Sequence, residues 1–374
     1  MKKKILFLLF FIGISISYGY SAVKSSEPPL SSMNTDFKVI EKLELKPFKE
    51  YDNLNLGSCI IDGSVLWYFR EGSRNFGSCY DLNTGKKLSV IATKGAASYE
   101  LAGLERFEVT NDCILLWSDK RTIKAIAKKD ILNNVSPENR TISVTTIPKD
   151  VLVSNVTRLP NGSFLATIHP AIFDFERGKR EDVNKNSVII FDNNEIKGYD
   201  PIKYDSFEIK APKEMETATN DLIKWAYAQG IVRTKGNDMA VFSLNNQFIL
   251  YTLDLKSGKV LNEKRYTKIL RDGVEMSFET KNDMHLEIKC MEVNDNYIFC
   301  YVIGYFSKED KQSKLLKDAI FVFDWNLKPI KKFELPSLWE EKDGHYMISK
   351  DCRSVYFCEN MKDVLMLYKA DLNM

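Results

Sequence analysis

Four basic residues stand within or just before short apolar segments in the middle of the chain: Arg106, Arg158, Arg233 and Lys289. Guanidinium and ammonium groups that surround one opening would bind a carboxylate, a phosphate or a sulfated glycan. The alternative is that these side chains point sideways and pair with nearby acids such as Glu105, Glu108 and Glu292. A shift of strand register by one residue would turn these side chains from one direction to the other. The strands that carry them therefore decide whether they face the opening or pair with acids.

Oxygen-bearing residues offer a second possibility, a calcium site. Glu108 and Asn155 are candidate ligands, but Ca²⁺ takes about six to eight oxygens, so the set is incomplete. The three histidines, of which His169 precedes a long polar stretch, lack metal-ligand spacing. Neither a Gly-rich phosphate loop nor a Gly-x-Ser-x-Gly motif occurs. The sequence identifies no catalytic residue, and we expect no cofactor, with calcium as the alternative.

The positions of these residues follow from a cassette of turn, apolar strand, loop, apolar strand and Asp-led turn, which recurs about six times. Short β-branched or aromatic runs between Gly, Asn and Asp turns are typical of antiparallel strands. In the first cassette they predict strands at Gly57–Ile61, Val65–Phe69, Ser78–Asp81 and Lys87–Ala92. The Asp residues of the closing turns are expected to cap those turns. They are Asp81, Asp130, Asp192, Asp254, Asp324 and Asp371.

One such unit cannot bury both of its faces, so the units must stack around an axis. The sequence therefore predicts an all-β fold, a six-bladed β-propeller of four-stranded antiparallel blades. The sixth cassette contains three strands, and a lone strand at Phe37–Leu45 precedes the first cassette. We expect this N-terminal strand to complete the last blade, which closes the ring and covers exposed edges. Residues 36–374 then form a single domain.

The Asp-Gly turn at Asp62-Gly63 and the Asp-led closing turns resemble those of six-bladed propellers of the TolB-like and NHL-like kind. The resemblance spans about residues 36–374 and is carried by turn chemistry. It implies extracytoplasmic binding or scaffolding. Relatives of the fold include calcium-dependent hydrolases and lactonases, so the resemblance does not exclude an enzyme.

The N-terminus has the features of a secretory signal peptide. Lys2, Lys3 and Lys4 precede an apolar run, Ile5–Ile16, and small residues follow it. We expect a signal peptide at 1–22, a linker at 23–35, and export to the periplasm or the extracellular space; an uncleaved anchor is the alternative. No cysteine precedes Cys59, so we expect no lipid anchor, and no second apolar run predicts a membrane span. The net charge of +2 favours no nucleic-acid partner.

Two of the seven cysteines, Cys290 and Cys300, could face each other across a hairpin. A three-residue turn at 294–296 would place Val293 opposite Tyr297 and Cys290 opposite Cys300, close enough to form a disulfide. The alternative is a pair of buried thiols in a sheet.

Strands alternate in direction, so the connections of a propeller divide between two faces. With strands lettered A to D from the axis outward, the A–B and C–D turns share one face, the turn face. The B–C and D–A connections share the other, the loop face. The longest insertions, at 169–186, 211–230 and 307–318, all belong to the loop face. The middle one contains a segment of helical spacing at 217–228.

The expected function is an exported scaffold that binds an envelope or extracellular protein or glycan through the loop face. The expected contacts are Phe173, Phe175, Arg177, Arg180 and Trp225, with His169 at the mouth of the longest loop. The alternative is a metal-dependent hydrolase or lactonase with a site at the mouth of the central tunnel. A purely structural envelope protein is a third hypothesis.

Overall fold

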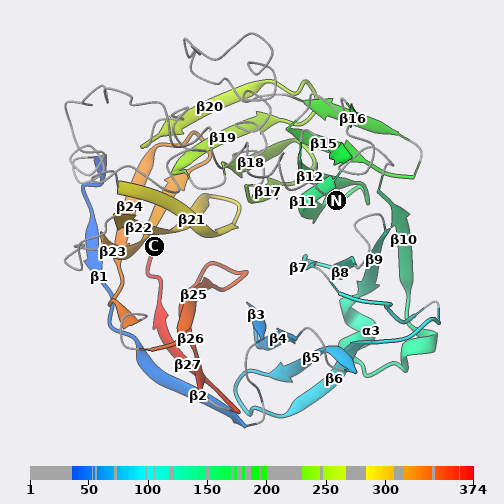
Figure 1. Ribbon diagram of the computed structural model, residues 1–374. Coiled ribbons are helices and arrows are strands. Elements are labelled where there is room, and N and C mark those ends of the chain that lie inside the picture. Colours follow the sequence, from blue (N-terminus) through cyan, green and yellow to red (C-terminus); the bar gives the residue numbers. More distant parts are fainter. Residues whose placement is uncertain are drawn as a thin grey trace, which may run out of the picture.

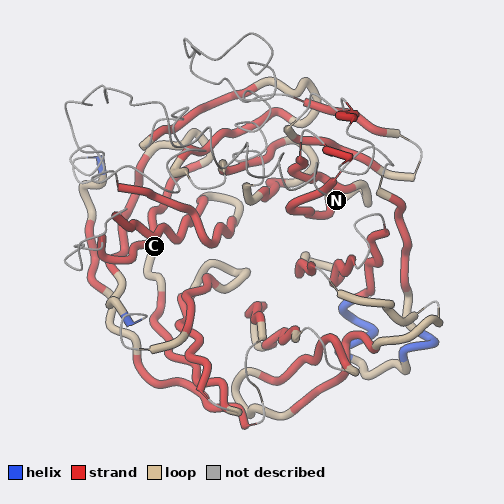
Figure 2. The backbone as a smooth tube through the Cα atoms, in the orientation of Figure 1, coloured by secondary structure: helices blue, strands red, loops and turns tan. Residues whose placement is uncertain are grey.

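Six antiparallel blades surround a central axis in the computed structural model of the chain (Figure 1). Strands account for most of the regular structure (Figure 2). No helix among the described residues is long and apolar enough to span a bilayer. The structure describes residues 36–374 except 53, 55–56, 71–73, 98, 105, 118–121, 148–151, 170–171, 175–178, 182–186, 194, 200–229, 245–246, 267–283, 307–315, 339–341 and 362.

The blades follow one another along the chain, and the four strands of each blade are arranged from the axis outward. Blade one contains, in this order, β3 (Ser58–Asp62), β4 (Val65–Phe69), β5 (Asn75–Asp81) and β6 (Lys87–Thr93). Blade two contains β7 (Arg106–Val109), β8 (Cys113–Trp117), β9 (Thr122–Ala127) and β10 (Ile142–Thr146). Blade three contains β11 (Leu152–Arg158), β12 (Phe164–His169), β15 (Val188–Phe191) and β16 (Ile196–Tyr199).

The second half of the ring has the same order. Blade four contains β17 (Val232–Lys235), β18 (Met239–Ser243), β19 (Ile249–Asp254) and β20 (Val260–Arg265). Blade five contains β21 (Met284–Val293), β22 (Tyr297–Phe306), β23 (Leu316–Asp324) and β24 (Pro329–Glu334). Blade six contains β25 (Gly344–Ile348), β26 (Ser354–Met361), β27 (Val364–Asp371) and β2 (Lys46–Asp52). The six-bladed fold predicted from the cassettes is confirmed, and β4 has the bounds that the sequence predicted.

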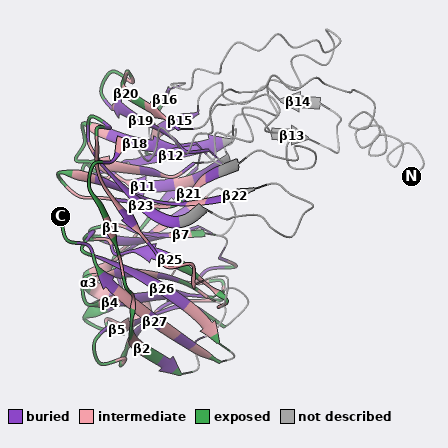
Figure 3. Ribbon diagram, turned by 90° about the vertical axis from the view of Figure 1, so that its left-hand side faces the viewer, coloured by how far each residue is buried: buried purple, intermediate pink, exposed green. Residues whose placement is uncertain are grey.

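The middle strands of the blades are apolar because neighbouring blades cover both of their faces. Every residue of β8 is buried, and in β18 four consecutive residues from Ala240 are buried. The cores lie between blades; one cluster joins Leu115 of blade two to Val156 of blade three. In Figure 3, buried residues follow the strands and exposed residues lie toward the rim. Such continuous apolar runs are expected of strands that are covered on both sides.

Local turn chemistry closes the blades as predicted at four of the six aspartates; the exceptions are Asp130 and Asp371, the latter of which ends β27 and accepts the Ser354 hydroxyl at 3.2 Å. In blade one, Asp81 Oδ1 accepts the backbone N–H of Thr84 at 2.7 Å, and Gly85 follows with a φ of +77°. Aspartate and glycine suit these two positions because the first caps the turn and the second tolerates positive φ. In blade two, Asp130 lies instead in a short helix. The two helical elements that follow β9 are α3 (Lys128–Leu132) and the 3-10 helix η1 (Pro137–Asn139).

The N-terminus closes the ring, but through a different segment from the one predicted. β2 (Lys46–Asp52) pairs antiparallel with β27 and forms the outer strand of blade six. The predicted segment Phe37–Leu45 lies against blade five, where β1 (Ile40–Lys42) pairs in parallel with β24. The predicted range was wrong because it followed apolar alternation. An outermost strand is exposed and therefore tolerates charges and Pro47.

The segment before β1 contacts both blade four and blade five at their rim. Phe37 is buried, and its ring packs edge-on against Phe321 and Phe323, with centroids 5.2 and 5.4 Å away. The Asp36 carboxylate forms an ion pair of 2.5 Å with Lys264 of β20. The N-terminal segment therefore contacts blades four, five and six in turn.

The predicted disulfide between Cys290 and Cys300 is absent, and all seven cysteines are free. β21 has a bulge between Ile288 and Cys290, and Cys300 lies opposite Met291. Val293 faces Ile298 rather than Tyr297, so the strand register differs by one residue from the predicted one. A shift of one residue moves each side chain to the other face of the strand, which separates the two thiols.

We expect the native thiols to react slowly with a disulfide reagent such as dithionitrobenzoate. Burial raises the pKa of the Cys300 thiol well above its usual value, and the thiolate is the reactive form. When the same chain is unfolded in guanidinium without reductant, all seven thiols should react with the reagent. A count of five, seven less the two of one disulfide, would contradict the structure.

Candidate functional site

Four charged side chains from four blades meet at the axis of the ring. Arg233 of β17 forms ion pairs with Glu108 of β7 at 3.3 Å and with Glu292 of β21 at 3.0 Å. Lys350, in the turn between β25 and β26, lies 2.5 Å from Glu108 and 3.0 Å from Glu292. The carboxylates and the cations alternate around a closed circuit. We call these four residues the axial network.

The axial network spans the ring rather than joining neighbours. Glu108 belongs to blade two, whereas its partners Arg233 and Lys350 belong to blades four and six. Their inner strands stand on different sides of the axis in Figure 1, so the side chains must meet across the middle. Glu108 and Glu292 each lie two residues before an A–B turn, and Lys350 lies in one. The network therefore crosses the axis near the turn face.

Electrostatics keep Glu108, Arg233 and Lys350 charged. Burial alone would raise the pKa of Glu108, but the charges of Arg233 and Lys350 hold that pKa below its usual value. Burial opposes protonation of Arg233, yet Glu108 and Glu292 raise its pKa. The pKa of Lys350 is also raised, because the two carboxylates outweigh burial and the repulsion from Arg233. With two charges of each sign, the network has no net charge to offer an anion.

The remaining basic candidates each have a partner on the protein. Arg106 donates to the backbone carbonyl and the hydroxyl of Ser154, Arg158 pairs with Asp112 at 3.0 Å, and Lys289 pairs with Glu287 at 2.7 Å. Arg233 is held in the axial network. The structure therefore places the four basic candidates in separate contacts, not around one shared opening.

The candidate calcium ligands are engaged as well, and the residues do not fit a calcium site. Glu108 is occupied by Arg233 and Lys350, and the Asn155 side-chain oxygen accepts the backbone N–H of Val232 at 3.1 Å. That second contact joins blade three to blade four. In the part of the chain that the structure describes, no group of three or more His, Cys, Asp or Glu residues gathers as a metal site.

The loop-face candidates are placed by the backbone alone. His169 ends β12, opposite Leu152 of β11. Phe173 and Arg180 pair with each other in a hairpin made by β13 (Ile172–Asp174) and β14 (Lys179–Glu181), an insertion between β12 and β15. The other three candidates, Phe175, Arg177 and Trp225, fall outside the described residues. So do the 217–228 segment and the part of the blade-five loop at 307–315.

The sequence analysis missed Lys350, whose side chain completes the axial network. Its backbone N–H donates to the carbonyl of Ile61 in blade one at 2.8 Å, which fixes the turn of blade six beside β3. Its place between two strand segments marks an A–B turn. Nothing in the local sequence says that this turn reaches the axis.

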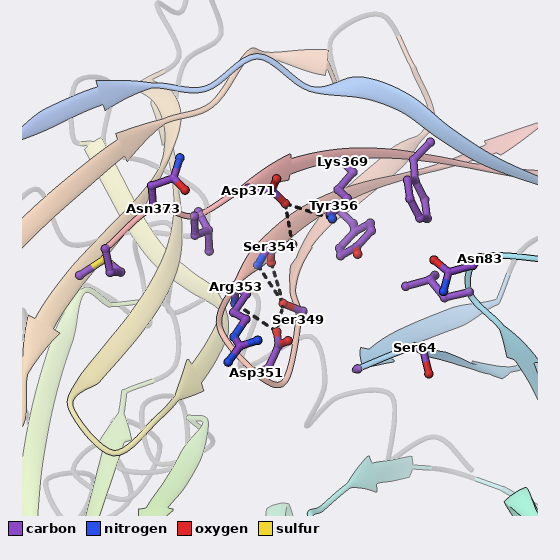
Figure 4. A pocket seen from close by; sticks show the side chains of 15 residues that line it. Ser64, Asn83, Ser349, Asp351, Arg353, Ser354, Tyr356, Lys369, Asp371 and Asn373 are labelled. Atoms are coloured by element: carbon purple, nitrogen blue, oxygen red, sulfur yellow. Dashed lines mark hydrogen bonds and ion pairs between the residues drawn. The ribbon is translucent and has the colours of Figure 1, made fainter.

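A cavity of about 630 Å³ was also not predicted, and it lies on the turn face between blades six and one (Figure 4). Its walls come from the A–B turns of both blades, the C–D turn of blade one and the end of β27. Ser64 and Asn83 line one side, and Asp351, Arg353 and Asp371 line the other. We call this cavity the turn-face pocket.

The fold defines the class of the protein, a six-bladed β-propeller. No protein-family model matches the chain, and no curated protein matches it. Among solved structures, the β-propeller domain of Cps50 (Swd1) from Myceliophteria thermophila is 8% identical with a TM-score of 0.43, and the match covers 88% of this chain and 99% of that one. Hsv2 from Kluyvelomyces marxianus is 10% identical with a TM-score of 0.39, covering 79% and 72%.

The computationally designed Ika8 protein is similar at 9% identity and a TM-score of 0.38, and the match covers 83% of this chain and 70% of that chain. Identities this low carry no statement about function.

Proposed function

We propose that this propeller is an exported binding protein that engages an envelope or extracellular protein through its loop face. The observation that carries the proposal is the difference between the two faces. The A–B connections are short, from 63–64 in blade one to 349–353 in blade six. On the loop face, blade three has the inserted β13–β14 hairpin between its middle strands. Segments added to a rigid scaffold are where binding usually occurs.

The strand lengths of blade five also favour the loop face as the binding surface. β21, β22 and β23 contain 10, 10 and 9 residues, whereas β17, β18 and β19 of blade four contain 4, 5 and 6. The added length lies at the loop-face end, where Met284 pairs with Phe306. The taller blade and the hairpin would form a raised border, which suits a broad protein surface, because stable interfaces bury about 800 Å² per partner.

The axial network affects the side from which a partner can enter the ring. Its side chains cross the axis near the turn face, so we expect a partner that enters the ring to come from the loop face. Export rests on the leader-like sequence at 1–22, and the TolB-like and NHL-like resemblance agrees with an extracytoplasmic binding role.

Replacing Phe173 and Phe175 together with alanine tests the proposal. We expect partner capture from envelope or secreted extract, measured by cross-linking and quantitative mass spectrometry, to fall about tenfold, because interface aromatics contribute most of the binding energy. The melting temperature should change by less than about 2 °C. Leu261→Ala, at an exposed apolar position of β20, is the matched control and should leave capture unchanged. A large loss of melting temperature would instead make the two rings core residues, and unchanged capture would refute the proposal.

A further inference from the structure

The turn-face pocket lies on the side opposite the proposed partner surface, so it needs a separate explanation. Its volume of about 630 Å³ falls within the usual range for small-molecule sites. Two blades share its walls, and Figure 4 shows polar side chains from both blades around the opening. A cavity between two rigid blades is formed before any ligand arrives.

Several polar groups in the pocket have no protein partner. The guanidinium of Arg353, the carboxamide of Asn83 and the hydroxyl of Ser64 are exposed, and they make no hydrogen bond or ion pair with the described residues. Arg353 and Asn83 stand on opposite walls (Figure 4). Together they can donate to and accept from one molecule held between them.

Other polar groups are fixed in place and keep acceptor capacity. Asp351 Oδ1 accepts the Ser349 hydroxyl at 2.6 Å, and Asp371 Oδ1 pairs with Lys369 at 3.0 Å. The second oxygen of each carboxylate remains able to accept a hydrogen bond. The two carboxylates balance the charges of Arg353 and Lys369, so the side chains that line the pocket carry no net charge.

Aromatic and apolar surface completes the lining. Phe48 of β2 and Tyr356 of β26 meet edge to face with ring centroids 5.9 Å apart, and both line the pocket. Leu82 and Leu372 add buried aliphatic surface. Aromatic rings offer a π face to weakly polarised C–H groups.

We propose that the turn-face pocket binds a neutral oligosaccharide of about two or three sugar units, a size suited to a cavity of this volume. Sugar hydroxyls both donate and accept, which matches the mixed donors and acceptors on the two walls. The sugar C–H faces match the partly exposed ring of Phe48, which packs on the buried ring of Tyr356. A polyanion is disfavoured because the lining side chains carry two charges of each sign, so no net field attracts it.

The test is binding of maltotriose, cellotriose, xylotriose and chitotriose to the full chain, measured by calorimetry and by saturation-transfer NMR. We expect at least one trisaccharide to bind with a Kd of about 1 mM or tighter and to receive saturation at its ring C–H protons. Asn83→Ala and Arg353→Ala should each weaken that binding about tenfold without changing the melting temperature. Neither residue supports the fold, since both side chains are exposed and unpartnered among the described residues.

Asn326→Ala is the matched control, because Asn326 occupies the corresponding C–D turn of blade five outside the pocket. It should bind as the unchanged chain does. Three outcomes overturn the proposal: no trisaccharide binds at about 10 mM, trialanine or inorganic phosphate binds and the saccharides do not, or Asn83→Ala and Arg353→Ala bind like the control. None of these outcomes alters the capture of a protein by the loop face, so the two proposals fail separately.

Discussion

Glu108→Ala should cost about 3–5 kcal/mol of unfolding free energy, enough to unfold many domains. The substitution leaves Arg233 and Lys350 buried across the axis with one carboxylate, Glu292, between them. An uncompensated buried charge is far more costly than the loss of the pair itself. Urea denaturation followed by circular dichroism measures the change.

Two further variants separate charge from packing. Glu108→Gln keeps the side-chain volume and removes the charge, so it should be destabilised nearly as much as Glu108→Ala. Asp112→Ala removes the partner of Arg158 at a site where the carboxylate side chain is 67% exposed, and it should cost about 0–1 kcal/mol. A Glu108→Gln chain as stable as the unchanged protein would show that the charges of the axial network do not hold the blades together.

The same network predicts how stability depends on pH. The folded pKa of Glu108 lies below its usual value of 4.5, so its contribution is fully present above about pH 4.5. The contribution is lost as the pH falls through the folded pKa, because protonation then removes the charge that Arg233 and Lys350 require. Unfolding free energy should therefore fall below about pH 4 in the unchanged chain by more than in Glu108→Gln. Equal pH profiles of the two chains would contradict this.

Deletion of Lys46–Asp52 should abolish cooperative folding, since it removes the outer strand of blade six and the closure of the ring. The exposed edge of β27 would then be open to pair with other chains. We expect loss of the cooperative thermal transition and oligomers in size-exclusion chromatography. A monomeric truncated chain with near-native melting would show that β2 is dispensable.

A point variant in the same strand gives a finer measure. The Tyr51 ring is buried and its hydroxyl donates to the carbonyl of Leu82 in blade one at 3.2 Å, so Tyr51→Ala should cost about 3–5 kcal/mol. Ile40→Ala in β1 is the control. Its side chain is exposed, and the change should stay within about 0.5 kcal/mol.

The sequence alone determined most of the strands and turns of this protein. Val65–Phe69 is a strand because five large apolar residues stand between a Gly63 turn and the next loop. Asp81 caps its turn because its carboxylate accepts the backbone N–H of Thr84, three residues later. These signals are local, and a repeated local signal is enough to predict a six-bladed ring. The blade-two helix α3 escaped prediction, because Asp130 suits a turn as well as a first helical turn.

Only the tertiary structure decided which distant residues meet. The strand register set at the hairpin turn placed Cys300 opposite Met291 rather than Cys290. The outer edge of blade six pairs with Lys46–Asp52 and not with the more apolar Phe37–Leu45. Glu108 and Lys350 are 242 residues apart, and Asn83 and Arg353 belong to different blades. Local patterns fix backbone conformation, whereas strand register and ring closure fix where each side chain points. The axial network and the turn-face pocket therefore exist only once the ring is closed.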